Sequence, residues 1–225
     1  MPAHALRALR SSPRSVKTFV DVGSEGRPVT RTIYHIRHGE TDWNAAGRLQ
    51  GGRDIPLNDR GRRQADGNGR ALGAHFSAIQ RDPSTLTWIA SPLGRTRETM
   101  ERVRRGAGLE PSAYATHPDL REVSFGRYEG LTYADLDVQA PRAAAELRRD
   151  KWNFVPPDGE SYAMLIARVG GFLAGTSGDL VIVSHGGVFR VLRALIEESE
   201  DHELAHLFVP QDRIFRWQDR HGAWL

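Results

Sequence analysis

The 225-residue chain contains no cysteine. Disulfide bonds, thiolate zinc sites and cysteine nucleophiles are therefore excluded, and the composition fits a reducing compartment, so we expect a cytoplasmic protein. The chain also has no apolar run near the roughly 20 residues that a membrane helix requires. Its most apolar stretch, "DLVIVSHGGVF" at positions 179–189, is short and contains polar residues. We expect no membrane partner.

The sequence has little excess charge of either sign. Lysine and arginine number 31 against 28 aspartates and glutamates, which gives a formal net charge of +3. A strongly basic surface would be needed to grip nucleic acid, and no aromatic residues are interleaved with the arginines near the N-terminus. Nucleic acid is therefore not an expected partner.

The first 30 residues differ from the rest of the chain. The first 17 carry four arginines and lysines, and no acid precedes Asp21. The segment lacks the apolar core of a secretory signal, and its composition suits either an organellar transit peptide or a loosely ordered leader, of which we favour the leader. We predict a basic leader over residues 1–30 and a single folded domain over residues 31–225.

Strand patterns alternate with helix patterns from residue 32 onward. Buried strands are predicted at 32–36 ("TIYHI"), 85–90 ("TLTWIA") and 180–184 ("LVIVS"). Helices are predicted at 58–79 with Asn58 as N-cap, 91–105 with Ser91 as N-cap, 141–152, 160–175 and 187–198, and a hairpin at 213–225. This alternation predicts an α/β fold, a three-layer α/β/α sandwich with a mostly parallel central sheet. The hairpin would expose an edge strand that could pair with a second copy in a homodimer.

Charged and polar residues follow three of these strands. They are Arg37 and His38 after the first strand, Arg95 shortly after the second, and His185 with Gly186 after the third. Ligands bind beyond the carboxyl ends of parallel strands, so we expect these residues to share one rim of the sheet. Guanidinium groups match phosphate oxygens, and glycines that open a helix leave backbone N–H groups free for an anion. The pattern predicts a phosphate site.

Each of these residues also has a purely structural interpretation. A histidine after a strand is usually a satisfied structural residue, and "SHGG" is also typical of a tight strand-to-helix turn. Arg95 lies in the first turn of its predicted helix, where the macrodipole disfavours a cation unless an anion is nearby. Glu122, in "LREVSFGRYEG", could be a catalytic acid or could pair with Arg121 or Arg127 on the surface. The spacing alone does not decide between these roles.

The stretch "RHGETDWN" at 37–44 resembles the signature of the histidine phosphatase superfamily, the phosphoglycerate mutase-like proteins. Further blocks of this family follow in the same order: "LQGGRDIPLNDRGRRQA", "SPLGRTRET", "LREVSFGRYEG", "PPDGES" and "VIVSHGGVFRVL". The resemblance spans about residues 32–196 and implies a phosphoglycerate mutase-like fold, with a histidine phosphatase-like catalytic domain over 31–225. Asn58 stands where the family often has threonine. Gly67 and Gly69 weaken a helix that is usually regular, each by up to about 1 kcal/mol relative to alanine.

The resemblance also implies a mechanism. His38 is expected to attack phosphorus and form a phosphohistidine, while Glu122 protonates the leaving oxygen and later accepts a proton from water. The phosphoryl oxygens are expected to be held by Arg37, Arg95 and His185. The remaining substrate contacts are assigned to Asn44, Gln50, Gly51 and Gly186. No metal and no cofactor are expected, because guanidinium and imidazolium groups supply the positive charge.

The fate of the phosphohistidine is the main open choice. Attack by water would make the protein a phosphatase for a small phosphorylated metabolite, and return of the phosphoryl group to a bound product would make it a cofactor-dependent mutase. Family mutases have a long insertion that excludes water, whereas the corresponding interval here, 131–155, is short, so we favour the phosphatase. Its Arg148, Arg149 and Lys151 could recognise a second anionic group or form a solvated helix face. A catalytically silent protein that binds phospho-ligands is a further alternative, although the expected nucleophile and acid are both present.

Overall fold

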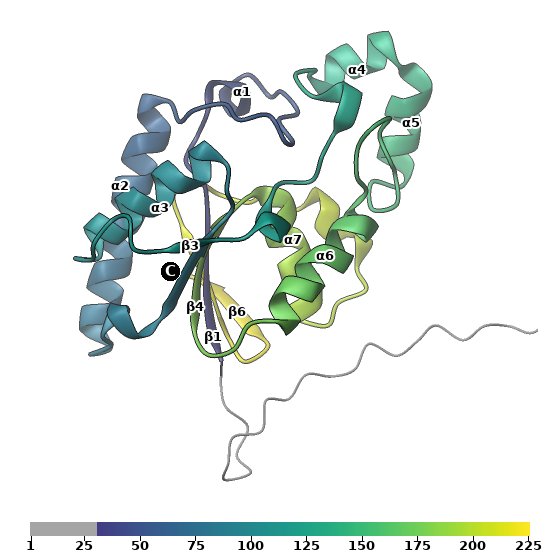
Figure 1. The fold of residues 1–225 in the computed structure, drawn as a ribbon. Coiled ribbons are helices and arrows are strands. Elements are labelled where there is room, and N and C mark those ends of the chain that lie inside the picture. The colour runs from purple at the N-terminus through teal and green to yellow at the C-terminus, as the bar shows by residue number, and fades with distance from the viewer. Residues whose placement is uncertain (1–30) are drawn as a thin grey trace, which may run out of the picture.

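The computed structural model of the protein describes residues 31–225, so the predicted basic leader lies outside the described residues (Figure 1). The described part forms a six-stranded sheet with the strand order β3-β2-β4-β1-β5-β6. The strands are β1 Thr32–Arg37, β2 Thr87–Ala90, β3 Ala115–Thr116, β4 Leu180–Ser184, β5 Ile214–Gln218 and β6 His221–Trp224. Strands β1 to β4 pair in parallel, and β5 and β6 join antiparallel at one side, so the predicted mostly parallel sheet with a C-terminal hairpin is confirmed.

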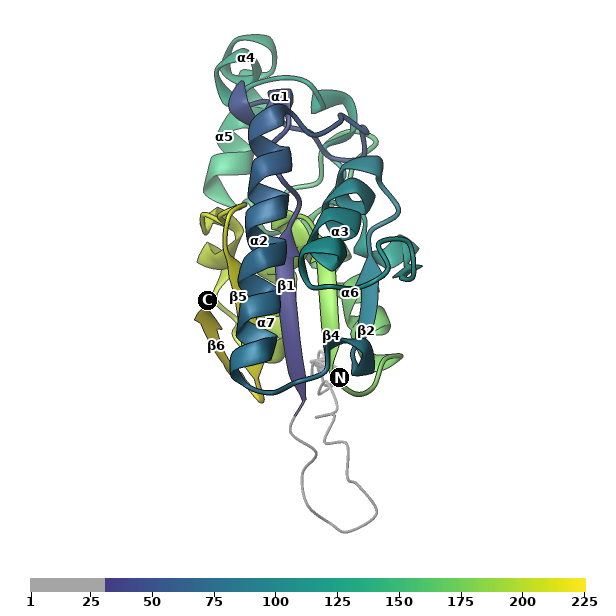
Figure 2. The same ribbon diagram turned by 90° about the vertical axis from the view of Figure 1, so that its left-hand side faces the viewer.

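The helices lie on both faces of this sheet. They are α1 Asp42–Ala45, α2 Asp59–Ala78, α3 Gly94–Gly106, α4 Tyr133–Gln139, α5 Pro141–Arg149, α6 Tyr162–Ala174 and α7 Gly186–Ile196. Short 3₁₀ helices occupy Pro83–Thr85, Pro118–Leu120, Gly126–Tyr128 and His202–His206. Helices α2 and α3 cover one face and α6 and α7 the other, which confirms the predicted three-layer sandwich (Figures 1 and 2). No helix within residues 31–225 combines the length and the apolarity that a transbilayer segment requires.

One predicted helix start is wrong. The sequence suggested Ser91 as the N-cap of helix 91–105, but α3 begins at Gly94 and its N-cap, Leu93, makes no side-chain cap bond. The free N–H groups of the first turn are bound instead by Asp54, whose carboxylate accepts from Gly94 at 2.7 Å and from Arg95 at 3.4 Å. A cap supplied by a residue 40 positions earlier leaves no local sequence signal.

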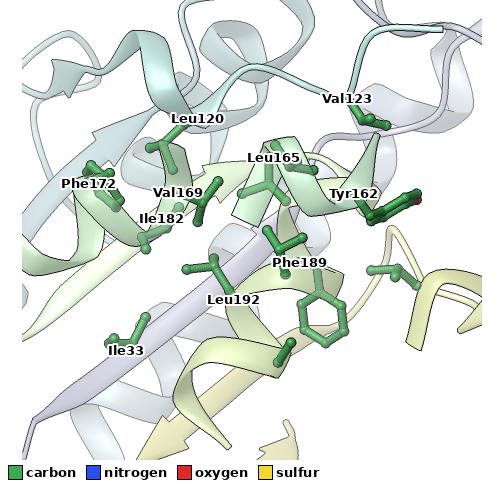
Figure 3. Packing of buried hydrophobic residues seen from close by; sticks show 14 of the residues in the cluster. Ile33, Leu120, Val123, Tyr162, Leu165, Val169, Phe172, Ile182, Phe189 and Leu192 are labelled. Atoms are coloured by element: carbon green, nitrogen blue, oxygen red, sulfur yellow. The ribbon is translucent and has the colours of Figure 1, made fainter. Parts of the chain in front are cut away.

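The core on the α6–α7 side fixes the helix that carries the late sequence block (Figure 3). Leu165 and Val169 of α6 and Phe189 of α7 are fully buried and pack with Ile182 of β4. Burial of each such side chain stabilises the fold by about 1.5–3 kcal/mol. Because this packing fixes the whole of α7, it also fixes the position of the helix N-terminus at the end of β4.

Helix α2 is continuous through Gly67 and Gly69, and these two of its glycines have different surroundings. A Cβ atom on Gly69 would lie 3.0 Å from the Arg102 carbonyl and the Val103 backbone of α3, whereas one on Gly67 would meet only the Arg70 side chain at 4.0 Å. The absence of a side chain at Gly69 therefore lets α2 and α3 pack closely, as they do side by side in Figure 2. No close contact among residues 31–225 requires a glycine at position 67.

Candidate active site

A cavity of about 130 Å³ lies at the carboxyl ends of β1 and β4, beside the N-termini of α3 and α7. It is lined by eight of the nine residues predicted from the sequence: Arg37, His38, Asn44, Gln50, Gly51, Arg95, Glu122 and Gly186. The ninth, His185, is fully buried next to the cavity, with its ring centroid 5.2 Å from that of His38. The fold therefore gathers all nine predicted residues in one place.

His38 directly follows β1 and is buried. Its backbone N–H donates to the Ser184 carbonyl at 2.9 Å, which joins the ends of β1 and β4. On the side chain, Nδ1 lies 2.8 Å from the Gly39 carbonyl and Nε2 lies 3.3 Å from Nε of Arg95. Because a guanidinium only donates and a carbonyl only accepts, Nδ1 carries the proton and Nε2 keeps its lone pair. Burial, followed by the charges of Arg95 and Arg37, lowers the pKa of His38 well below its usual value, so the imidazole is neutral.

Arg95 is buried in the first turn of α3, and several fixed groups hold it. Its guanidinium donates to the carbonyls of Arg53 at 2.6 Å and of Gly51 at 2.9 Å. The Asp54 carboxylate that caps α3 lies 3.8 Å from the same guanidinium. This negative charge offsets the unfavourable interaction between a cation and the positive end of the helix. The predicted conflict at Arg95 is thus resolved by Asp54.

His185 lies between Arg95 and Ser91. Its Nε2 is 2.8 Å from the Ser91 hydroxyl and its Nδ1 is 3.3 Å from Nη2 of Arg95. Burial, followed by the charge of Arg95, lowers the pKa of His185 well below its usual value. An anion in the cavity would oppose this effect and favour the imidazolium. Ser91, which was predicted to cap a helix, instead holds this histidine.

Arg37 presents a donor that nothing in residues 31–225 satisfies. Its Nη1 donates to the Val209 carbonyl at 2.7 Å, whereas its buried Nε has no hydrogen-bond partner in this part of the chain. A Cβ atom on Gly186 would lie 3.6 Å from that Nε, so the start of α7 borders the same position. Burial, followed by the charge of Arg190, lowers the pKa of Arg37 to about 10. A buried guanidinium N–H without a partner, beside a helix N-terminus, suits an anion.

Glu122 lies against the first turn of α7. Its Oε1 accepts from the backbone N–H groups of Val123 and Gly187, both at 3.0 Å. A Cβ atom on Gly187 would lie 2.3 Å from this oxygen, so only glycine leaves room for the carboxylate. The sequence pointed to the N–H groups of this helix start as anion ligands. The Gly187 N–H is used by Glu122 instead, and this contact fixes the acid in the cavity wall.

The Gln50-Gly51 loop is shaped by a second acid that the sequence did not identify. Gly51 has φ +52°, and a Cβ atom there would lie 2.0 Å from Oε1 of Glu129. The same oxygen accepts from the Gly52 N–H at 2.8 Å. Glu129 therefore holds the loop in the conformation that directs the Gly51 carbonyl to Arg95.

Asn44 reaches the cavity from α1, whose N-terminus is closed by a capping box between Thr41 and Asn44. Its Nδ2 lies 3.2 Å from the Gln50 side chain, and its Oδ1 accepts from Nε2 of Gln211 at 3.0 Å. Gln211 also donates to the His38 carbonyl at 3.0 Å. It lies outside every sequence block that indicated function, so no motif identified it.

The rest of the polar lining is also cationic. It consists of Arg48, Tyr133, Lys151, Tyr162 and Arg190, and we call this set the outer wall. Arg190 donates to the Leu207 carbonyl and to the Tyr162 hydroxyl, both at 2.9 Å. Burial, followed by the charge of Arg190, lowers the pKa of Lys151 to about 8. Among the described lining residues, five carry a positive charge and only Glu122 is acidic, so the cavity favours an anionic ligand.

The sequence identified this outer wall only in part. Of the three basic residues noted in the interval 131–155, Lys151 lines the cavity, whereas Arg148 pairs with Asp137 and Arg149 is exposed. Arg190 was not predicted. Its position one helical turn after Gly186, on the same face of α7, was the available signal.

No set of three or more histidine, aspartate or glutamate side chains within residues 31–225 is arranged to hold a metal ion.

The chain is similar in sequence to proteins of known activity class. The chain is 31% identical over 179 residues to glucosyl-3-phosphoglycerate phosphatase of Mycobacterium tuberculosis, covering 74% of this chain and 75% of that protein. It is 33% identical over 169 residues to phosphoglycerate mutase-like protein 4 of Arabidopsis thaliana, covering 71% and 68% of the two chains.

A longer relative matches only in part. The 6-phosphofructo-2-kinase/fructose-2,6-bisphosphatase of Caenorhabditis elegans is 30% identical over 193 residues, and the match covers 84% of this chain but 39% of that protein. The present chain thus spans well under half of this relative's length.

Two solved structures share the fold of this chain. The native mycobacterial glucosyl-3-phosphoglycerate phosphatase superposes with a TM-score of 0.69 at 28% identity, over 83% of this chain and 89% of that one. YhfR of Bacillus stearothermophilus superposes with a TM-score of 0.69 at 26% identity, over 83% and 90%. Residues 33–224, which hold the whole cavity, match the histidine phosphatase superfamily (branch 1), and the chain belongs to that family.

Proposed function

We propose that the protein is a phosphomonoester hydrolase that works through a phosphohistidine at His38. The observation that carries the proposal is the neutral, buried imidazole of His38, whose Nε2 lies in a cavity lined by Arg37 and Arg95. An unprotonated ring nitrogen, with its lone pair, is the form that attacks phosphorus, and Nε2 can do so once the phosphate takes over the hydrogen bond from Arg95. Fixed guanidinium groups neutralise the charge of the phosphate that this lone pair must approach.

The chemistry divides into two displacements. In the first, the Nε2 lone pair of His38 forms an N–P bond as the P–O bond to the alcohol breaks, and protonated Glu122 gives its proton to the leaving oxygen. In the second, Glu122 takes a proton from water, the water oxygen bonds to phosphorus, and the N–P electron pair returns to Nε2. The three non-bridging oxygens are held by Arg37, Arg95 and His185. Loss of one such donor typically costs about 3–4 kcal/mol of transition-state stabilisation.

Hydrolysis is favoured over return of the phosphoryl group by the small cover above the cavity. The cover consists of α4 and α5, which have 7 and 9 residues. A small cover admits water to the phosphohistidine, whereas a mutase must exclude water while its substrate turns over. A mutase-type transfer remains the second candidate, since a phosphoglycerate mutase-like protein is among the relatives.

For the substrate we propose a small phosphorylated metabolite with a second anionic group. Lys151 and Arg190 line the cavity in addition to Arg37 and Arg95, and the only acid among the described lining residues is Glu122. Partly desolvated cations attract a carboxylate or a second phosphate more strongly than exposed ones do. This would place the scissile phosphate at His38 and the second anion at the outer wall.

The test is phosphate release from a substrate panel: para-nitrophenyl phosphate, sugar phosphates and phosphoglycerates. We expect turnover by the wild type and a loss of roughly 10³-fold or more in kcat for His38→Ala. Substrate labelled at phosphorus should transfer an acid-labile label to the wild type and none to His38→Ala. Absence of phosphate release across the panel, or release that His38→Ala leaves unchanged, would contradict the proposal.

The same panel separates the alternatives. Incubation with 3-phosphoglycerate and a trace of 2,3-bisphosphoglycerate identifies a mutase if isomerisation exceeds phosphate release. Lys151→Met should raise KM for substrates with a second anionic group and leave KM for para-nitrophenyl phosphate within roughly 2-fold, because only the former reach the outer wall. An equal rise for both kinds of substrate would argue against a second anion site.

A further inference from the structure

The loop between the 3₁₀ helix His202–His206 and β5 contacts the catalytic cavity on a side that no sequence block reaches. Two of its residues bind cavity residues directly. The Val209 carbonyl accepts from Nη1 of Arg37 at 2.7 Å, and the Gln211 side chain reaches the loop after β1. The loop is anchored from its other side by the buried Asn68 of α2, which donates to the Gln211 carbonyl at 3.0 Å.

The Gln211 amide bridges two parts of the cavity. Its Nε2 carries two hydrogens and has two acceptors, the His38 carbonyl and Oδ1 of Asn44, each at 3.0 Å. We propose that Gln211 is a positioning residue for phosphoryl transfer, which fixes the amide of Asn44 and the peptide of His38. This inference rests on the proposed function, in which both of those residues take part.

The contact with Asn44 decides which end of that amide the substrate meets. The Asn44 Oδ1 accepts from both the Gln211 amide and the Thr41 N–H, the latter at 3.3 Å. With Oδ1 held there, Nδ2 is directed to the Gln50 side of the cavity, as a donor to a phosphate oxygen. If the amide were reversed, a carbonyl oxygen would face the phosphate and repel it.

The contact with His38 acts on the nucleophile itself. The next peptide along the chain carries the Gly39 carbonyl, which binds Nδ1 of the His38 ring at 2.8 Å. The hydrogen bond from Gln211 fixes the His38 carbonyl, and so limits rotation of the backbone between His38 and Gly39. The Gly39 carbonyl therefore stays within reach of the His38 ring. The ring then keeps the orientation in which its Nε2 lies in the cavity. Misplacement of a reacting group by about 1 Å can reduce the rate roughly 100-fold.

Gln211→Met tests the inference, because methionine has a similar length and cannot donate. We expect kcat/KM to fall roughly 10- to 100-fold, mainly in kcat, while the melting temperature changes by less than about 4 °C. Asp212→Ala is the matched control, since Asp212 is exposed in the same loop, and its activity should stay within roughly 2-fold of the wild type. Unchanged kcat in Gln211→Met overturns the inference.

A double-mutant cycle distinguishes positioning from a general loosening of the loop. Gln211→Met should reduce activity less in an Asn44→Ala background than in the wild type, because one of its two contacts is already lost. If Gln211→Met reduces activity by the same factor in both backgrounds, Gln211 does not act through Asn44, and that part of the proposal is overturned.

Binding of orthovanadate tests the positioning role of Gln211 separately from the proposed hydrolase activity. If the wild type hydrolyses no substrate, the proposed function fails, but Gln211→Met should still weaken orthovanadate binding roughly 10-fold if it positions Asn44. Equal orthovanadate affinity in both proteins overturns the positioning role. A wild type that neither hydrolyses substrates nor binds orthovanadate overturns both.

Discussion

At the scale of single residues, the two glycines that open α7 have different tasks. Gly186 lies beside Arg37 with ordinary contact distances, so the space it leaves belongs to the anion site. Gly187 leaves space for Glu122, because a Cβ atom there would lie 2.3 Å from the carboxylate oxygen. The proposed function therefore gives these two glycines different roles: Gly186 leaves space beside Arg37 for the phosphate, and Gly187 leaves space for Glu122.

Gly187→Ala should displace the Glu122 carboxylate from its position against the first turn of α7. We expect kcat to fall roughly 10²- to 10⁴-fold, the range that general acid–base catalysis contributes. The loss should be largest for substrates with poor leaving groups, which depend most on protonation. Gly186→Ala, whose Cβ would lie 3.5 Å or more from its neighbours, should show a smaller loss without this dependence. Steady-state kinetics on aryl and alkyl phosphates would decide, and equal effects of both substitutions would contradict the assignment.

Lys151 should give substrate binding a dependence on alkaline pH. Burial lowers its pKa to about 8, so the free enzyme loses this charge as the pH rises through 8. The proposed second anion binds the charged form, so KM should rise by up to tenfold per pH unit above about 8. Lys151→Arg keeps its charge and should show a flat KM between pH 7 and 9, below the pKa of about 10 of Arg37. A wild-type KM that does not change between pH 7 and 9 would speak against a role for Lys151.

At the scale of elements, the contact between α2 and α3 explains a sequence feature that looked like a weakness. Two glycines in α2 were expected to cost helix stability. Gly69 faces the α3 backbone, and a Cβ atom on Gly106 of α3 would lie 2.6 Å from the Gly69 carbonyl carbon. The glycines at this crossing let the helices approach, and α3 is the helix that carries Arg95.

Substitution of Gly67 and of Gly69 in α2 should change stability in opposite directions. Gly67→Ala should stabilise the protein by up to about 1 kcal/mol, because it restores helix propensity at a position with free space. Gly69→Ala should destabilise it by roughly 1–3 kcal/mol, because the added Cβ presses on the α3 backbone. Urea denaturation measures both. Stabilisation by Gly69→Ala would show that the helices can separate without cost.

At the scale of the whole molecule, the fold buries three histidines close together. His35 lies in β1 and hydrogen-bonds Ser184 at 2.7 Å, and His38 and His185 lie at the strand ends above it. Burial, followed by the charge of Arg37, lowers the pKa of His35 to about 3. Burial and arginine charges lower the pKa of the other two well below the usual value. The sheet is thus built to hold neutral imidazoles.

These histidines should make the protein sensitive to acid. In the unfolded chain they bind protons below pH 6.5, whereas in the folded chain they stay neutral, so stability is complete above 6.5 and falls as the pH decreases. For His35 the cost should be about 1.4 kcal/mol per pH unit below 6.5, and His38 and His185 should add to it in the same direction. For His35 the decline should continue to about pH 3.

Urea denaturation at several pH values would measure this slope. His35→Gln retains a polar group for Ser184 and cannot titrate, so its stability should fall less steeply between pH 6.5 and 5.5 than that of the wild type, by about 1.4 kcal/mol per pH unit. A wild-type stability that is constant over this interval would show that the three imidazoles accept protons in the folded state.

Much of the fold was predictable because the relevant information is local. The strand β1 and the helix α2 appear as patterns of side chains, and Asn58 caps α2 as its sequence suggested, accepting from Gly61 at 2.8 Å. The start of α3 was not predictable from Ser91, because its capping carboxylate belongs to Asp54 in another loop. Local patterns determine the elements, whereas their ends depend on neighbours that folding supplies.

The sequence by itself determined the family and the alternation of the main strands and helices. It also placed Arg37, His38, Arg95, His185 and Gly186 at one rim, since parallel strands deliver their carboxyl ends to one edge. Asn44, Gln50, Gly51 and Glu122 were expected there only through the resemblance to the family, and β3, α1 and α4 were not predicted. The tertiary structure decided what surrounds these nine residues. Gln211 meets His38 across 173 positions of sequence, and Arg190 meets Tyr162 across 28. Such contacts form only when the helices pack on the sheet and bring distant segments together, so the spacing of residues in the sequence does not predict them.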